Sequence, residues 1–94
     1  MPRVEAFAIN GIELWFNSAD HDPAHFHARK PGAWEIRVSI VSTTNKTLSY
    51  SFKWPTRGAT VAGRLQKELR DATVRHRVTL LVEWENKVVV KERF

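Results

Sequence analysis

The chain has 94 residues, of which 43% are hydrophobic and 27% are charged, and this balance excludes an intrinsically disordered protein. It contains no cysteine, so disulfides, thiolate metal sites and cysteine nucleophiles are excluded as well. Its 15 Lys and Arg residues outnumber 10 Asp and Glu residues, and the net charge of +5 favours an anionic partner. Neither a signal-peptide core nor a membrane-spanning apolar run is visible. We therefore expect one cytoplasmic domain over residues 1–94, with no membrane partner.

Residues 1–54 predict a meander of antiparallel strands. The pair Asn10-Gly11 is typical of a type I′ hairpin turn, because both central positions of that turn need a positive φ. Extending the hairpin outward from this turn pairs Phe7 with Leu14.

Two further strands are predicted at residues 25–30 and 34–40, where apolar and polar side chains alternate on either side of a Pro-Gly turn. Matching the apolar faces of these strands places Ala28 opposite Ile36. The same register sets Arg29 opposite Glu35, which predicts an ion pair between the two strands.

A fifth strand is predicted over residues 48–52. The resulting sheet of four or five strands has one apolar and one polar face. The residues predicted on the polar face are Glu13, Trp15, His25, His27, Arg29, Glu35, Arg37, Ser49 and Ser51.

Residues 57–85 predict a helix that covers the apolar face of the sheet, and residues 86–94 predict a tail. This prediction rests on an apolar stripe at helical spacing, which consists of Val61, Leu65, Leu69 and Ala72. Residues 78–84 and 88–90 are rich in β-branched side chains, so a terminal strand or a hairpin about Glu85-Asn86-Lys87 is an alternative. The predicted fold class is α+β, with a C-terminal helix over an antiparallel meander.

Three of the four histidines lie in the segment Asp-His-Asp-Pro-Ala-His-Phe-His, which begins at Asp20. His25 and His27 share one face of a predicted strand, and His21 or Asp20 can approach from the preceding loop. Three protein ligands with an open position are typical of a catalytic zinc site. Zinc, manganese and nickel are the candidate ions. Hydrogen bonding of these side chains to the backbone around Pro23 is the alternative interpretation.

The polar face also suggests two roles that need no metal. His25 and His27 can act as general base and acid on RNA, with Arg29 contacting the phosphate. Alternatively, Trp15, Arg29 and Arg37 form a binding surface for a nucleic acid, RNA rather than DNA, for a small partner protein, or for a second copy of this chain. His76 is predicted on the opposite side of the sheet from the other histidines.

The chain resembles the domain of unknown function 4160 family of small bacterial proteins. The signature of that family, Asp-His-x-Pro-Pro-His-Phe-His, is matched by Asp20, His21, Pro23, His25, Phe26 and His27, whereas Ala24 replaces its second proline. The opening and ending of the family are matched by Pro2, Phe7, Gly11, Ile12, Trp15-Phe16, His76-Arg77, Leu80-Leu81 and Trp84-Glu85. The resemblance implies a sheet followed by a helix, and a member of a two-gene module similar to toxin–antitoxin pairs.

Together these observations predict a small accessory protein that binds RNA, DNA or a partner protein through the face around His21, His25 and His27. A metal-assisted or histidine-dependent ribonuclease that uses the same three histidines is the alternative function.

Overall fold

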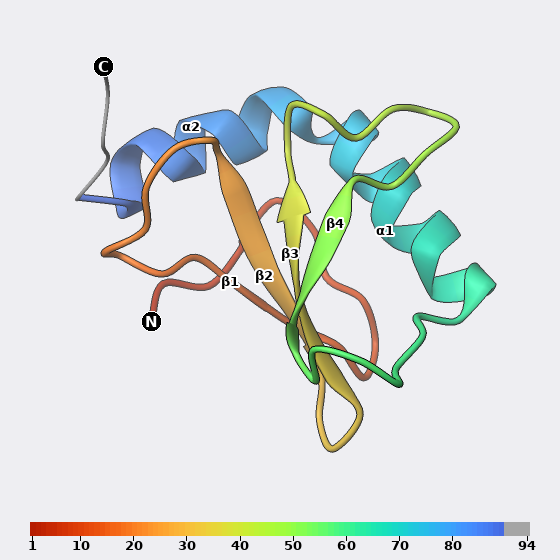
Figure 1. Cartoon of the computed structure of the whole chain (residues 1–94). Coiled ribbons are helices and arrows are strands. Elements are labelled where there is room, and N and C mark those ends of the chain that lie inside the picture. Colours follow the sequence, from red (N-terminus) through yellow and green to blue (C-terminus); the bar gives the residue numbers. More distant parts are fainter. Residues whose placement is uncertain (90–94) are drawn as a thin grey trace.

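The computed structural model describes residues 1–89 and confirms the α+β meander with C-terminal helical cover (Figure 1). Four antiparallel strands lie in the order β1-β2-β3-β4 and precede two helices. The elements are β1 (Glu13–Trp15), β2 (His25–Lys30), β3 (Trp34–Ser39), β4 (Tyr50–Trp54), α1 (Gly63–Arg75) and α2 (Arg77–Lys87).

The predicted pairing of β2 with β3 is confirmed residue by residue. Ala28 pairs with Ile36, and Arg29 pairs with Glu35. This register turns one face of both strands toward the helices, and Phe26, Ala28, Ile36 and Val38 on that face are fully buried. Removing these apolar side chains from water is the main force that holds the helices against the sheet.

The helical region differs from the single helix predicted over residues 57–85. Residues 57–62 are not helical, and the remainder forms two helices that meet at His76. His76 leaves helical geometry with φ −106° and ψ 19°, while its amide still donates to the Ala72 carbonyl. The change of direction allows both helices to bury apolar side chains on the same side of the sheet, among them Leu69 of α1 and Leu80 of α2 (Figure 1).

The alternative of a terminal hairpin is wrong, because residues 77–87 form α2. The helix buries Leu80 and Trp84, which are four residues apart, and leaves Val78 and Val82 exposed. The β-branched residues thus lie mainly on the outer side of a helix that tertiary packing stabilises. Of the predicted tail, residues 90–94 lie outside the described residues.

The first hairpin differs from the prediction as well. A turn is present, with Ile9 bridged to Ile12, but it is not of type I′, because Gly11 has a positive φ of +82° and Asn10 does not. Nor does Phe7 pair with Leu14. Instead the Val4 amide donates to the Leu14 carbonyl. Residues 5 and 6 are drawn away from β1 because their amides donate to the carboxylate of Glu83 on α2. The sheet therefore has four strands, of which β1 is a short edge strand.

Neither of the two helices within residues 1–89 is both long enough and apolar enough to cross a membrane.

Candidate metal centre

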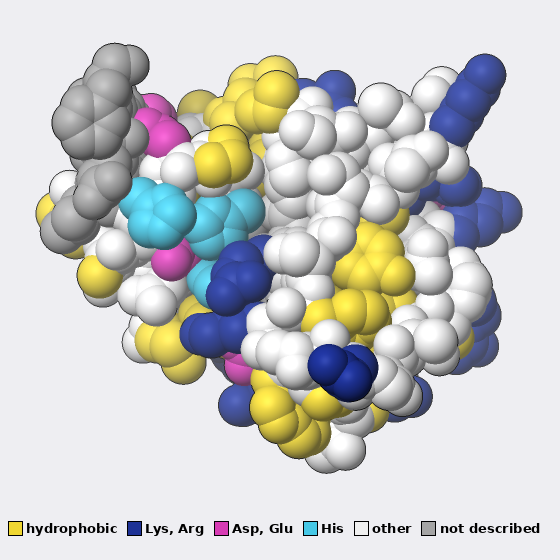
Figure 2. All heavy atoms as spheres, in the orientation of Figure 1, with side chains coloured by type: hydrophobic (Ala, Val, Ile, Leu, Met, Phe, Trp, Pro, Cys, Tyr) yellow, Lys and Arg dark blue, Asp and Glu magenta, His cyan; other side chains and the backbone are white. Residues whose placement is uncertain are grey.

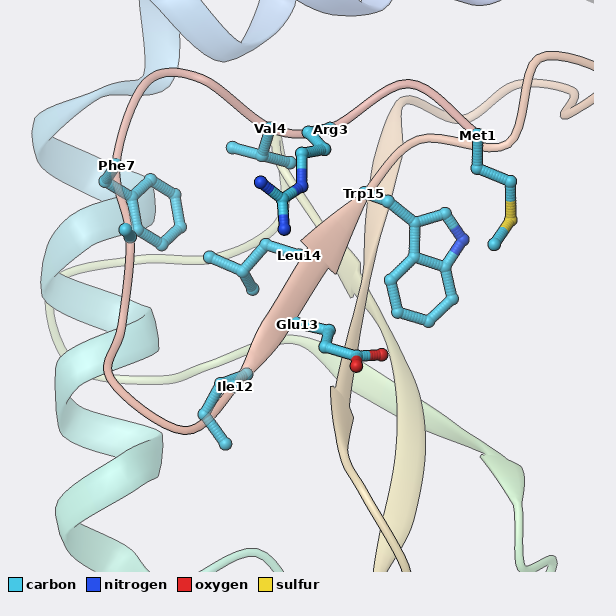
Figure 3. Close-up of a pocket in the computed structure, with 9 residues that line it drawn as sticks. Met1, Arg3, Val4, Phe7, Ile12, Glu13, Leu14 and Trp15 are labelled. Carbon is cyan, nitrogen blue, oxygen red and sulfur yellow. The ribbon is translucent and has the colours of Figure 1, made fainter.

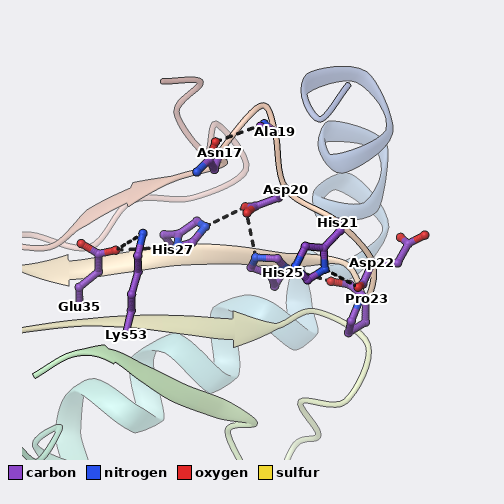
Figure 4. Close-up of polar contacts among 10 residues, drawn as sticks. All are labelled: Asn17, Ala19, Asp20, His21, Asp22, Pro23, His25, His27, Glu35 and Lys53. Atoms are coloured by element: carbon purple, nitrogen blue, oxygen red, sulfur yellow. Dashed lines mark hydrogen bonds and ion pairs between the residues drawn. The ribbon is translucent and has the colours of Figure 1, made fainter. Parts of the chain in front are cut away.

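Three side chains converge on the polar face of β2, and we call them the histidine centre: Asp20, His25 and His27 (Figure 4). His25 and His27 point to the same side because successive side chains of a strand alternate between its faces. The loop before β2 brings Asp20 over them. One ligand atom from each residue lies within 4.8 Å of the other two, so the group can hold a metal ion.

The Asp20 carboxylate is the hub of the centre. Its Oδ2 atom is 2.8 Å from Nε2 of His27 and 3.2 Å from Nε2 of His25 (Figure 4). The two rings also touch each other edge to face, with centroids 5.1 Å apart. Two imidazole nitrogens and one carboxylate oxygen thus lie close together, and nitrogen and oxygen donors of these kinds bind divalent metal ions.

The second ring nitrogen of His25 fixes the orientation of that ring. Nδ1 of His25 lies 2.9 Å from the carbonyl oxygen of Pro23, which can only accept a hydrogen bond. Nδ1 therefore carries a hydrogen, and in the neutral ring Nε2 presents its lone pair toward Asp20. Histidines that bind a metal through Nε2 are held in this way by an oxygen behind Nδ1.

His27 lies deeper than His25, with 3% of its side chain exposed. The Trp15 ring is stacked on its ring at a centroid distance of 5.3 Å. Burial lowers the pKa of His27 below its ordinary value of 6.5, although the hydrogen bond to Asp20 opposes this shift. The neutral imidazole is thereby favoured, and it is the form that binds metal ions.

Two atoms beside His27 are buried and form no hydrogen bond: Nδ1 of His27 and Oε2 of Glu35. They lie 4.0 Å apart, on the side of the ring away from Asp20 (Figure 4). Nζ of Lys53 forms an ion pair with the same Glu35 oxygen at 3.4 Å.

His21 and Trp15 do not occupy the places predicted for them. His21 is exposed and lies outside the group of three, with its Nδ1 2.9 Å from the Asp22 carbonyl oxygen. Trp15 is only 8% exposed, because its ring contacts the His27 ring and the Arg29 guanidinium and its backbone is bridged to Arg3. It is not an open surface on which a base can stack.

The predicted ion pair between Arg29 and Glu35 is wrong. Arg29 donates from Nε to the Glu13 carboxylate at 2.7 Å, because β1 brings Glu13 directly opposite Arg29 on the other side of β2. Arg37 is opposite His27 on β3 and is exposed. Within residues 1–89 it has no ion-pair partner, so its charge is available to an anion.

Glu35 and Lys53 are neighbours of the centre that the sequence prediction missed. The sequence pattern pairs Glu35 with Arg29 and predicts no register between β3 and β4. The register between these strands shifts after Glu35, so that Lys53 becomes an extra residue between the partners of Glu35 and Ile36. The signal in the sequence was the diagonal position of Glu35 relative to His27 on one face of the sheet.

A hollow of about 390 Å³ lies between the N-terminal segment and β1, with Trp15 among the residues that line it (Figure 3). Its walls combine polar and apolar surface, and Val4, Ile12 and Leu14 are among the residues that line it. Its carboxylate, Glu13, is engaged by Arg29. The only group suited to a metal ion among the described residues is the histidine centre, so the hollow offers no second one.

Basic side chains gather beside the histidines on the face shown in Figure 2, where cyan and dark blue atoms adjoin. An anion that approaches the centre from this side therefore meets positive charge.

Comparisons of the chain with protein-family models, with curated proteins and with solved structures find no match. The resemblance to the domain of unknown function 4160 family stays a prediction from the residues quoted above.

Proposed function

We propose that this chain binds one divalent metal ion at the histidine centre and uses it to hydrolyse a phosphate ester, with RNA as the substrate class. The observation that carries the proposal is the convergence of Asp20, His25 and His27, whose ligand atoms lie within 4.8 Å of one another. Three protein ligands leave positions for water and substrate, as in catalytic zinc sites. An ion bound there supplies a hydroxide nucleophile near neutral pH.

The two imidazoles support a metal better than they support acid–base catalysis without one. A general acid and a general base have to reach opposite ends of the bond that is cleaved. Here Nε2 of His25 and Nε2 of His27 are both directed at one oxygen of Asp20. Arg29, the third residue of that hypothesis, is already paired with Glu13.

A phosphate-bearing substrate is supported by charge rather than by a shaped pocket. Arg37 lies directly across from His27, is exposed, and is well suited to bind a phosphate with two hydrogen bonds. The net charge of +5 also favours polyanions. Binding of RNA or a partner without chemistry loses the contribution predicted for Trp15, because that ring is buried.

Metal analysis of the untagged protein, prepared without chelator and then titrated with zinc, manganese or nickel, tests the first half of the proposal. We expect one ion per chain in the wild type and none in His25→Ala/His27→Ala. His21→Ala is the matched control, because it removes a histidine of the same segment that lies outside the group of three. No bound metal in the wild type overturns the proposal.

Cleavage of a fluorescent RNA oligonucleotide tests the second half. We expect cleavage by the metal-loaded wild type, loss of cleavage with a chelator, and a rate reduced about tenfold or more in Arg37→Ala. Arg64→Ala is the control, because Arg64 is an exposed arginine on α1. A metal-loaded protein that retains full binding to RNA but never cleaves it contradicts hydrolysis and favours the binding module.

A further inference from the structure

Two buried polar atoms beside the histidine centre face each other without a hydrogen bond. Nδ1 of His27 and Oε2 of Glu35 are 4.0 Å apart, and both are shielded from water. Within residues 1–89 they are the buried side-chain nitrogen and oxygen atoms that lack a hydrogen-bond partner. Leaving such atoms unpaired destabilises a fold, so a pair of them calls for a physical explanation.

The hydrogen bond on the other side of the His27 ring explains why the two atoms are unpaired. Asp20 accepts through Oδ2, so Nε2 of His27 has to carry the hydrogen of the neutral ring. Nδ1 then carries a lone pair that points at Oε2 of Glu35. Both atoms are hydrogen-bond acceptors, so no hydrogen bond can form between them.

A metal ion at Nε2 of His27 reverses this arrangement. The nitrogen that binds the ion has to offer its lone pair, so the ring hydrogen moves to Nδ1. Nδ1 then becomes a donor aimed at the Glu35 carboxylate, and both unpaired atoms obtain a partner. His25 already has an oxygen behind its Nδ1, namely the Pro23 carbonyl.

We infer that Glu35 is a positioning residue of the metal centre: it accepts a hydrogen bond from Nδ1 of His27 when Nε2 binds the ion. This inference builds on the proposed metal site and adds to it the group that selects the tautomer and orientation of His27. Lys53, 3.4 Å from Oε2, holds the Glu35 carboxylate in place from β4. Carboxylates in this outer position change metal affinity about 10- to 100-fold.

Competition titration with a chromophoric zinc chelator compares four proteins: wild type, Glu35→Ala, Glu35→Gln and the control Glu13→Ala. We expect zinc affinity to fall about 10- to 100-fold in Glu35→Ala, and to recover partly in Glu35→Gln because the amide oxygen still accepts a hydrogen bond. Glu13→Ala removes a carboxylate of the same sheet face that does not contact either histidine, so we expect no change in affinity.

Nitrogen-15 NMR of the histidine rings shows which nitrogen of His27 carries the hydrogen. A purely structural role of Glu35 would not affect this position. We expect the hydrogen of His27 on Nε2 in the metal-free protein and on Nδ1 after zinc is added. The Nδ1 hydrogen is expected to exchange slowly with water in the wild type and rapidly in Glu35→Ala. The melting temperature of metal-free Glu35→Ala should stay close to that of the wild type, because the buried Oε2 atom forms no hydrogen bond there.

The outcomes separate the two proposals. If the wild type binds zinc and Glu35→Ala binds it equally well, the role of Glu35 is overturned and the metal site stands. A large drop in the melting temperature of metal-free Glu35→Ala, with affinity unchanged once refolded, also overturns it in favour of a structural role. If the wild type binds no zinc, both proposals fall together.

Discussion

Two polar clusters tie N-terminal segments of this chain to its regular elements, and the hydrogen-bonding atoms of the two clusters are satisfied to different degrees. Glu83 of α2 accepts hydrogen bonds from the amides of Glu5 and Ala6, at 2.8 and 2.9 Å, and from Nζ of Lys87 at 2.7 Å. We call this group the Glu83 clamp. Asp20, at the histidine centre, faces two imidazole nitrogens instead.

In the Glu83 clamp, donors meet both carboxylate oxygens, and Lys87 also reaches Glu5 at 2.5 Å. At the histidine centre, Nδ1 of His27 and the neighbouring Oε2 of Glu35 form no hydrogen bond, although Lys53 forms an ion pair with Oε2 at 3.4 Å. A polar network in which every atom has a hydrogen-bond partner stabilises one conformation. Buried polar atoms without such a partner destabilise the folded state. Departures of this kind are expected at functional sites, so the contrast separates a structural cluster from a candidate functional one.

The largest effect is expected from breaking the Glu83 clamp. Glu83→Ala leaves two backbone amides and the Lys87 ammonium without their shared acceptor, and the free energy of unfolding should fall by about 3 kcal/mol. Urea denaturation measures this loss. Glu68→Ala, which removes only an exposed pair on α1, should change it by less than about 0.5 kcal/mol. A loss below about 1 kcal/mol in Glu83→Ala contradicts the structural role of the clamp.

Zinc should stabilise the protein through the histidine centre alone. A ligand present at about 100 times its dissociation constant adds about 2.7 kcal/mol to the free energy of unfolding. We expect this gain in the wild type and in Glu83→Ala, and its loss in Asp20→Ala, when denaturation is repeated with and without zinc. Retention of the gain in Asp20→Ala would show that the ion binds elsewhere.

Acid should weaken the metal-free protein through His27, with a smaller effect than the two above. Burial lowers the pKa of His27 in the folded state, so below its ordinary value of 6.5 the unfolded chain binds the proton more readily. The contribution of His27 is complete above pH 6.5 and is lost as the pH falls from there toward the lowered pKa. Melting temperatures measured from about pH 8 to about pH 5 should show this decline, less steeply in His27→Gln than in His21→Ala. Equal slopes in the two variants contradict the prediction.

The smallest effect is expected for Arg29. Its ion pair with Glu13 is about half exposed, so Arg29→Ala should lower the free energy of unfolding by less than about 1 kcal/mol. Zinc affinity should be unchanged, because Arg29 does not contact the histidine centre. If Arg29→Ala binds zinc normally but cleaves RNA much more slowly than the wild type, Arg29 has the catalytic role predicted from the sequence.

Local patterns were enough to predict the arrangement of β2 and β3. Alternation along each strand and the turn at Gly32 specify which side chains face each other, so Ala28 opposite Ile36 was predicted and is confirmed. The same period of two places His25 and His27 on one face. Asp20 was a candidate because only a short loop separates it from these histidines.

The tertiary structure alone decided which groups surround that face. Trp15 is buried because it contacts His27, Arg29 and the distant residue Arg3, whose backbone is bridged to it. β1 also brings Glu13 to Arg29, which bonds to Glu13 instead of Glu35. The Glu35 carboxylate therefore faces His27 and forms an ion pair with Lys53 (Figure 4).

The sequence by itself therefore determined the register between β2 and β3, the shared face of the two histidines and the presence of helical cover. Each of these follows from periodicity within a few residues of the chain. The break between the helices at His76 and the unpaired atoms at His27 and Glu35 were decided by tertiary structure. They depend on contacts between residues far apart in the sequence, and no local pattern encodes which partner a side chain will meet.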